Sequence, residues 1–308
     1  MLVVFTGGTG GAKLIEGLSH EIDSAQLTIV CNTADDFVFH GLHISPDLDT
    51  IMYTLAGLSD PEQGWGIRGD TFTVLQRLEE LGGDAWFKLG DKDIATHITR
   101  TRWLREGLTL SEVTDRLRRH LGVKARVFPM SNDGIETRVE TDEGEISFQE
   151  YFVKRSWQPT VKKIFYAGVE KSVPAPGVLH AIETAAGIII GPSNPVTSIG
   201  PILSVPGIRT ALLRRAVPVV GVSPMIGEFA ISGPAHKLMT AEGMEPSALG
   251  TARGYADFLD QFVIDHADDA LISRVEALGV KVVATSIRMN SSSDKQQLAR
   301  QVLALIDK

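Results

Sequence analysis

The sequence predicts an α/β fold: a doubly wound, mostly parallel, Rossmann-like sheet with an inserted smaller α+β region. The stretch "VVFTGGTGGAKLIEGL" joins an apolar strand to a glycine-rich loop and the start of a helical pattern. Apolar strands and helical patterns then alternate, which is typical of a parallel sheet covered on both faces. Residues 125–153 differ, because they alternate in the manner of antiparallel strands.

The first unit runs from strand to helix to strand. Val3 to Thr6 form a short apolar run, Leu14, Leu18 and Ile22 repeat at helical spacing, and Leu27 to Cys31 form a second run. The crossover of such a βαβ unit should be right-handed. An irregular stretch then leads into helical patterns near residues 49–58, 71–81, 91–105 and 111–121.

The middle of the chain interrupts this rhythm. Asp133-Gly134 and Glu143-Gly144 stand at turn positions between predicted antiparallel strands. The α/β rhythm resumes near residue 161 with "VKKIFYAGV" as the next strand. We therefore expect a single domain over residues 1–308. Its Rossmann-like body should cover about 1–90 and 160–308, with a helical and antiparallel insertion over about 91–160.

Composition excludes several classes of protein. The chain has 308 residues, is 43% hydrophobic and 22% charged, and carries a net charge of −8, which is a poor match to non-specific nucleic-acid or anionic-membrane binding. No leader and no run of about 18 apolar residues is present, so we expect a cytoplasmic protein that does not span a membrane. The single cysteine, Cys31, excludes an internal disulfide and should be a buried, inert thiol.

The glycine-rich loop matches neither of two well-known phosphate loops. Lys13 stands where the dinucleotide fingerprint needs its third glycine, and Leu14 stands where the P-loop needs a hydroxyl. Glycines still allow close approach of the backbone, and a helix N-terminus attracts anions. We expect Gly7–Gly11 to bind phosphate, the alternative being a tight turn without a ligand.

Two acidic clusters follow. In "SPDLDT", Asp47 and Asp49 stand at a helix start and could hold Mg²⁺ through carboxylate oxygens, although a cap would explain one of them. In "WFKLGDKDIATH", Asp91 or Asp93 could share the metal or cap a helix. Lys88 is either a cation for a ligand or a solvent-facing residue of a strand.

The stretch "GPSNPVTSIGPI" lies where a predicted strand ends. Ser193 and Asn194 offer neutral donors on a loop stiffened by prolines, which suits a phosphate or a nucleobase edge. A purely structural loop is the alternative. The histidines form no zinc pattern, so His97, His180 and His236 are expected to be packing or surface residues.

Taken together, "FTGGTGGAKL", "NTADD", "PDLDT", "WFKLGDKDIATH", "GPSNPVTSIGPIL" and "GVSPMIG" resemble the 2-phospho-L-lactate transferase (CofD) family of coenzyme F-420 biosynthesis. The resemblance covers nearly the whole chain. It implies Mg²⁺-dependent transfer of a phospholactyl or enolpyruvyl-phosphate group from a diphospho-guanosine donor to the deazaflavin alcohol Fo, with release of GMP.

The resemblance also implies site residues. Asp49 and Lys88 match family positions that contact Fo, and Asp47 and Asp49 are expected to act in catalysis and to hold Mg²⁺. A homodimer is expected. The residues expected to bind the nucleotide and its diphosphate are Gly7, Gly8, Thr9, Gly10, Gly11, Asn32, Ser193 and Asn194.

Three other classes compete with this hypothesis. The related gluconeogenesis-factor family contains nucleotide-binding regulatory proteins that share the glycine-rich start and lack the transferase activity. It typically has N-D-D-G-G-S after the second strand, whereas this chain has "NTADDFVFHG". An NAD(P)-dependent oxidoreductase is disfavoured by the missing third glycine. A non-catalytic binding module is disfavoured by the two acidic clusters.

Overall fold

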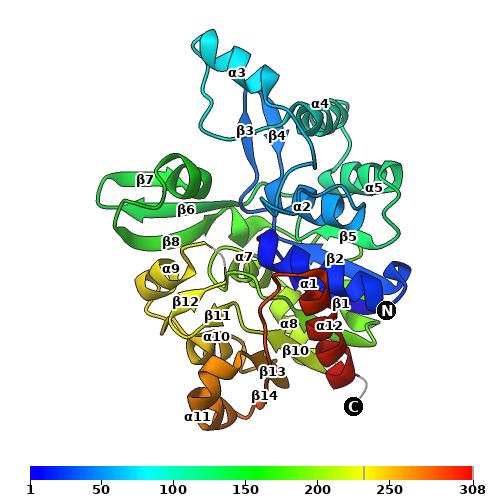
Figure 1. The fold of residues 1–308 in the computed structure, drawn as a ribbon, viewed down its shortest axis with the longest axis vertical. Helices are drawn as coiled ribbons and strands as arrows, with labels where there is room; N and C mark the ends of the chain where they lie inside the picture. Colours follow the sequence, from blue (N-terminus) through cyan, green and yellow to red (C-terminus); the bar gives the residue numbers. More distant parts are fainter. Residues whose placement is uncertain (232, 307–308) are drawn as a thin grey trace.

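A parallel sheet forms the centre of the computed structural model, which describes residues 1–231 and 233–306. Seven strands from these residues lie in the spatial order β14-β13-β10-β9-β1-β2-β5, and each neighbouring pair is parallel (Figure 1). The strands are β1 Leu2–Thr6, β2 Leu27–Cys31, β5 Arg126–Pro129, β9 Gly187–Ile190, β10 Val219–Val222, β13 Gln261–Ile264 and β14 Lys281–Ala284. Chain order reverses direction between β1 and β9, which confirms the predicted Rossmann-like fold.

Helices cover both faces of this sheet, as a doubly wound fold requires. One apolar core packs against α1, α2, α5 and α12, and the other packs against α6, α7, α8, α10 and α11. On the first face the bounds are α1 Gly8–Glu21, α2 Pro46–Leu55, α5 Leu110–His120 and α12 Ser292–Ile306. On the second they are α6 Val178–Glu183, α7 Ile199–Ser204, α8 Ile208–Arg214, α10 Ala248–Tyr255 and α11 Ile272–Glu276.

The strands read as continuous apolar runs because both of their faces are buried. Every residue of Leu27–Cys31 and of Gly187–Ile190 is buried. Cys31 is a buried free thiol, and burial raises its pKa well above the ordinary value, which confirms the expectation of an inert cysteine.

A first excursion leaves the sheet after β2 and returns at β5. It projects from the body at the top of Figure 1 and holds its own aromatic cluster around Phe39 and Trp86. Besides α2 and α5, its elements are β3 Phe37–Phe39, β4 Leu42–Ile44, α3 Thr73–Glu80 and α4 Asp91–Arg105. The helices predicted near 49–58, 71–81, 91–105 and 111–121 all form; α4 has the predicted bounds, and the other three have shifted ends.

A second excursion follows β5 and contains a small antiparallel sheet in the order β7-β6-β8. Its strands are β6 Glu136–Thr141, β7 Gly144–Ser147 and β8 Val161–Ala167, and a π-helix spans Glu150–Lys154. Helix α9, Ala235–Ala241, packs beside β8, and the hairpin of β11 Met225–Ile226 and β12 Phe229–Ala230 precedes it.

Two sequence expectations about this region were wrong. The run "VKKIFYAGV" was expected to resume the central sheet, but β8 pairs with β6 in the small sheet. The expected insertion over about 91–160 contains β5, which pairs with β2 in the central sheet. An apolar strand has the same pattern in either sheet, so only its partners decide where it belongs. Within the described ranges, no helix is long and apolar enough to cross a membrane.

Candidate functional site

The loops after β1 and β9 meet where the strand order reverses. The Ser193 hydroxyl donates to the carbonyl of Gly7 at 2.8 Å and accepts from the Gly7 amide at 3.1 Å. It also lies 3.0 Å from the Thr6 hydroxyl. Ser193 therefore ties the two loops together at the crevice where doubly wound sheets bind ligands.

The glycines of the first loop have different reasons to be glycine. A Cβ on Gly10 would lie 2.5 Å from the carbonyl oxygen of Pro192, and one on Gly7 would lie 2.4 Å from Asp47 Oδ2. A Cβ on Gly11 would overlap the Thr6 hydroxyl. Gly8 has a φ of +65° and is not crowded in this way. Close packing therefore explains three of the glycines, and Gly8 is the one whose backbone faces open space.

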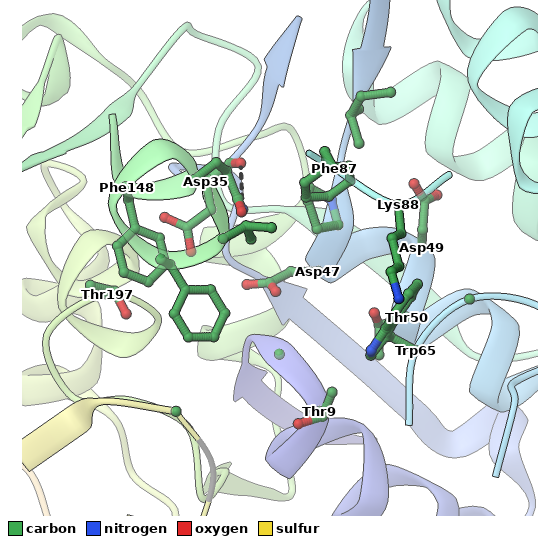
Figure 2. Close-up of a pocket in the computed structure, with 18 of the residues that line it drawn as sticks. Thr9, Asp35, Asp47, Asp49, Thr50, Trp65, Phe87, Lys88, Phe148 and Thr197 are labelled. Atoms are coloured by element: carbon green, nitrogen blue, oxygen red, sulfur yellow. Dashed lines mark hydrogen bonds between the residues drawn. The ribbon is translucent and has the colours of Figure 1, made fainter. Parts of the chain in front are cut away.

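A cavity of about 650 Å³ lies at this edge of the sheet. Gly8 and Thr9 of α1, and Asn194 and Thr197 of the loop after β9, line it. Figure 2 shows Thr9 and Thr197 on different sides of it. Both excursions contribute aromatic rings to the lining. These rings are Trp65, Trp86, Phe87, Phe148 and Phe152.

The two excursions also contact each other beside the cavity. The ammonium of Lys154, from the π-helix, lies 5.8 Å from the centre of the Trp86 ring. Phe148 and Phe152 stack with centroids 5.5 Å apart and planes 3° apart. Rings held in this way offer flat apolar surfaces that suit a planar ligand.

A pair of buried carboxylates, Asp35 and Asp47, lines the cavity. The Asn32 amide is 3.0 Å from both Asp35 Oδ2 and Asp47 Oδ2, so it bridges the two side chains. Asp35 Oδ1 is buried without a hydrogen bond of normal geometry to the described residues, although the nearby Thr137 hydroxyl partly lowers the pKa of Asp35. Burial, together with the neighbouring charge of Asp47, raises the pKa of Asp35 well above its usual range, and burial raises the pKa of Asp47 to about 6. Two buried carboxylates this close together repel each other unless a proton or a cation lies between them.

Asp49 has a different environment, although it shares the first turn of α2 with Asp47. Arg100, which is fully buried, donates to both carboxylate oxygens of Asp49, with Nη1 2.9 Å from Oδ2. The neighbouring Asp93 accepts a 2.6 Å hydrogen bond from the Tyr53 hydroxyl and lies 3.2 Å from His97 Nε2. Figure 2 shows Asp47 and Asp49 directed to different parts of the cavity.

The remaining predicted site residues do not all line the cavity. Asp91 accepts from the Thr71 hydroxyl and the Val74 amide, so it anchors the chain before α3 and does not line the cavity. Lys88 is exposed, lies outside any strand and lines the cavity near Thr50 (Figure 2). Asn194 accepts from the Val196 amide at 2.9 Å, so its side chain also shapes its own loop.

Sequence reasoning missed three residues of this site: Asp35, His97 and Arg100. The structure shows how two of them, His97 and Arg100, enter the site. The buried positions of α4 are Asp93, His97, Arg100 and Thr101, which repeat at helical spacing, whereas Ile98 is exposed. A helix that buries a polar stripe instead of an apolar one must face a polar partner, and here that partner is Asp49.

The reversal of strand order, the loops tied across it and the cavity beside them, with carboxylates and aromatic rings in its lining, define a doubly wound α/β protein with a candidate ligand site at the sheet edge. A family model described as 2-phospho-L-lactate transferase CofD matches residues 2–304. The chain belongs to this family.

Individual relatives agree with the family match. A 2-phospho-L-lactate transferase of Methanosarcina mazei is 43% identical over 302 residues, which cover 98% of this chain and 99% of the relative. A phosphoenolpyruvate transferase of Streptomyces griseus is 44% identical over 313 residues, covering 99% and 98%. A UPF0052 protein of Bacillus halodurans has a similar fold, with a TM-score of 0.64 at 17% identity and 98% of each chain covered.

Proposed function

We propose that this protein transfers a 2-phospholactyl or enolpyruvyl-phosphate group from lactyl- or enolpyruvyl-diphospho-guanosine to Fo, 7,8-didemethyl-8-hydroxy-5-deazariboflavin. GMP is released and coenzyme F-420-0 is formed. The supporting observation is one cavity that is lined by a helix N-terminus, by buried carboxylates and by aromatic rings from both excursions. A diphosphate suits the helix N-terminus, and a planar deazaflavin suits the rings.

The proposed reaction is a substituted phosphate-group transfer of the EC 2.7.8 type. The primary hydroxyl of Fo attacks the phosphorus that carries the lactyl or enolpyruvyl group. The new bond is a phosphoester, the bond from that phosphorus to the bridging oxygen of GMP breaks, and the hydroxyl proton leaves for the released phosphate or for water. Such a transfer depends on alignment and charge stabilisation more than on a protein nucleophile. This agrees with a site that presents carboxylates, amides and backbone N–H groups.

The nucleotide end is proposed to be built from Gly7–Gly11 with Asn32, Ser193 and Asn194. Gly8 and Thr9 face the cavity directly. Gly10 and Ser193 keep the two loops close enough to form one surface. The hydrogen bonds of Asn32 orient the carboxylates that face the phosphates.

Mg²⁺ is the proposed cofactor, and the Asp35–Asp47 pair fits it better than Asp47 with Asp49. Asp35 Oδ1 is a buried oxygen without a hydrogen bond of normal geometry within the described chain, and oxygen ligands of this kind suit Mg²⁺. Asp49 already carries a guanidinium on both oxygens, so it is a poor ligand. When bound, Mg²⁺ would neutralise charge on the diphosphate of the donor.

Incubation of the protein with Fo, Mg²⁺ and each donor in turn tests the proposal. GMP release and the mass of the phosphorylated deazaflavin are the two readouts. Product from one donor names the substrate, a choice that the names of the two relatives leave open. Absence of product with both donors, despite nucleotide binding, would favour a regulatory protein like those of the gluconeogenesis-factor family. We also propose a homodimer in the cytoplasm, which light scattering and cell fractionation would test.

A further inference from the structure

Arg100 lies beneath the cavity wall and is joined to Asp49 by a two-point contact. Its side chain is 0% exposed, and its two terminal nitrogens donate to the two carboxylate oxygens of Asp49. Burial alone would lower the pKa of Arg100, but the charge and hydrogen bonds of Asp49 raise it overall. A bidentate pair fixes the plane of the carboxylate as well as its position. Asp49 is therefore held in one orientation.

His97 extends this contact to a second carboxylate. Arg100 Nη1 lies 3.2 Å from His97 Nδ1, and because a guanidinium can only donate, Nδ1 accepts. The ring proton is then on Nε2, which lies 3.2 Å from Asp93 Oδ1, off the hydrogen-bond axis but close enough for electrostatic attraction. Burial alone would raise the pKa of Asp93, but contacts with His97 and the Tyr53 hydroxyl lower it.

A metal ion is the main alternative for this cluster. Oxygen and nitrogen atoms of Asp49, Asp93 and His97 lie within 4.8 Å of one another, which is close enough to share an ion. However, the guanidinium of Arg100 already donates to both oxygens of Asp49 and to Nδ1 of His97. A second cation would have to displace a buried guanidinium from its carboxylate, which is unfavourable.

Four members of this network reach the cavity, and Arg100 does not. Asp49, Tyr53, Asp93 and His97 line it, so Arg100 can affect a ligand only through them. We propose that Arg100 and His97 are positioning residues that hold the carboxylate of Asp49 in a fixed orientation toward the hydroxyl of the acceptor. This inference rests on the proposed function for the identity of the acceptor. The contacts of Arg100 and His97 with the two carboxylates are independent of it.

Arg100→Lys is the central test, because it keeps the positive charge and loses the two-point contact. We expect kcat to fall about 100-fold, as a misplacement of roughly 1 Å can cause. The dissociation constant of Fo, measured by its fluorescence, should change less than about threefold, because the aromatic walls are untouched. Arg102→Met is the matched control, since Arg102 lies on the same helix with its side chain 63% exposed.

Crystal structures of the variants separate this inference from the proposed function. In Arg100→Lys the carboxylate of Asp49 should rotate from its wild-type orientation. His97→Asn, expected to lower kcat about tenfold, is the second variant if Arg100→Lys does not fold. Wild-type kcat in the Arg100→Lys variant, or an unchanged Asp49 in both crystals, would overturn the inference. If the wild type transfers nothing to Fo, the proposed function fails. The orientation of Asp49 in the crystals still tests whether Arg100 and His97 position it.

Discussion

Asp47 and Asp49 stand two residues apart in the first turn of α2, yet their carboxylates lie in different electrostatic environments. Asp49 is neutralised by Arg100, whereas Asp47 accepts from the uncharged amide of Asn32. No Lys or Arg within the described ranges forms an ion pair with Asp47 or Asp35. Residues at i and i+2 of a helix do not face the same side, so one turn can supply two unlike carboxylates.

The first prediction concerns stability and pH. The pKa of Asp47 is about 6 in the folded protein, above the value of about 3.9 for an exposed Asp. Between these values the folded state binds more protons, so the free energy of unfolding falls as pH rises from about 4 to 6. Asp47→Asn should therefore raise the Tm at pH 7.5. The corresponding gain in the free energy of unfolding is at most about 3 kcal/mol.

Thermal unfolding from pH 4 to pH 8 checks this prediction. The advantage of Asp47→Asn should disappear near pH 4, where the wild-type carboxyl is itself protonated. Asp84→Asn, at an exposed position, serves as the control and should change little at any pH. An effect of Asp47→Asn that is equal at pH 4 and pH 8 would contradict the role of its charge.

The second prediction concerns Mg²⁺. Adding the ion at pH 7.5 should raise the Tm of the wild type, because binding to the folded state alone stabilises it by about 2.7 kcal/mol at 100 times the Kd. Asp35→Asn and Asp47→Asn should abolish this rise. Asp91→Asn should keep it, because Asp91 bonds to Thr71 and Val74 outside the cavity. A metal response that survives both Asp35→Asn and Asp47→Asn would exclude this pair as the ligands.

The third prediction compares two glycines with the same backbone strain. Gly8 has a φ of +65° and Gly57 a φ of +69°, so Ala at either position should cost about 1–2 kcal/mol of stability. Only Gly8 lines the cavity. Gly8→Ala should weaken GDP binding about tenfold by calorimetry, since the added methyl group stands between backbone and phosphate. Equal GDP affinity in the two variants would place the nucleotide elsewhere.

The fourth prediction concerns Lys88. Its side chain lines the cavity from the first excursion and is exposed, so its removal should not affect folding. Lys88→Met should raise the KM for the acceptor about tenfold with little change in Tm. Lys124→Met is a suitable control, because Lys124 is exposed and precedes β5 at the opposite edge of the sheet. An unchanged KM would leave Lys88 as a solvated surface residue.

Much of the fold could be predicted because its signals are local. Leu27–Cys31 was predicted and observed with the same bounds, since a strand buried on both faces has an uninterrupted apolar pattern. The placement of β8 could not be predicted, because strand pairing is decided by residues distant in sequence. The same limit applies to the site. The motif carrying Asp47 and Asp49 is visible in the sequence, but the Arg100 that distinguishes them is 51 residues beyond Asp49.

The two excursions enter the fold after β2 and after β5, so neither interrupts the loop from β1 to α1 or the loop that follows β9. The first excursion nevertheless supplies Asp35 and Asp47 as well as aromatic rings, so exchanging it would also replace the carboxylates of the site. The second excursion contributes Phe148 and Phe152 to the lining and neither of these carboxylates. If the proposed function holds, chimaeras that exchange only the second excursion would vary the wall of the acceptor pocket while the glycine-rich loop and the Asp35–Asp47 pair stay the same.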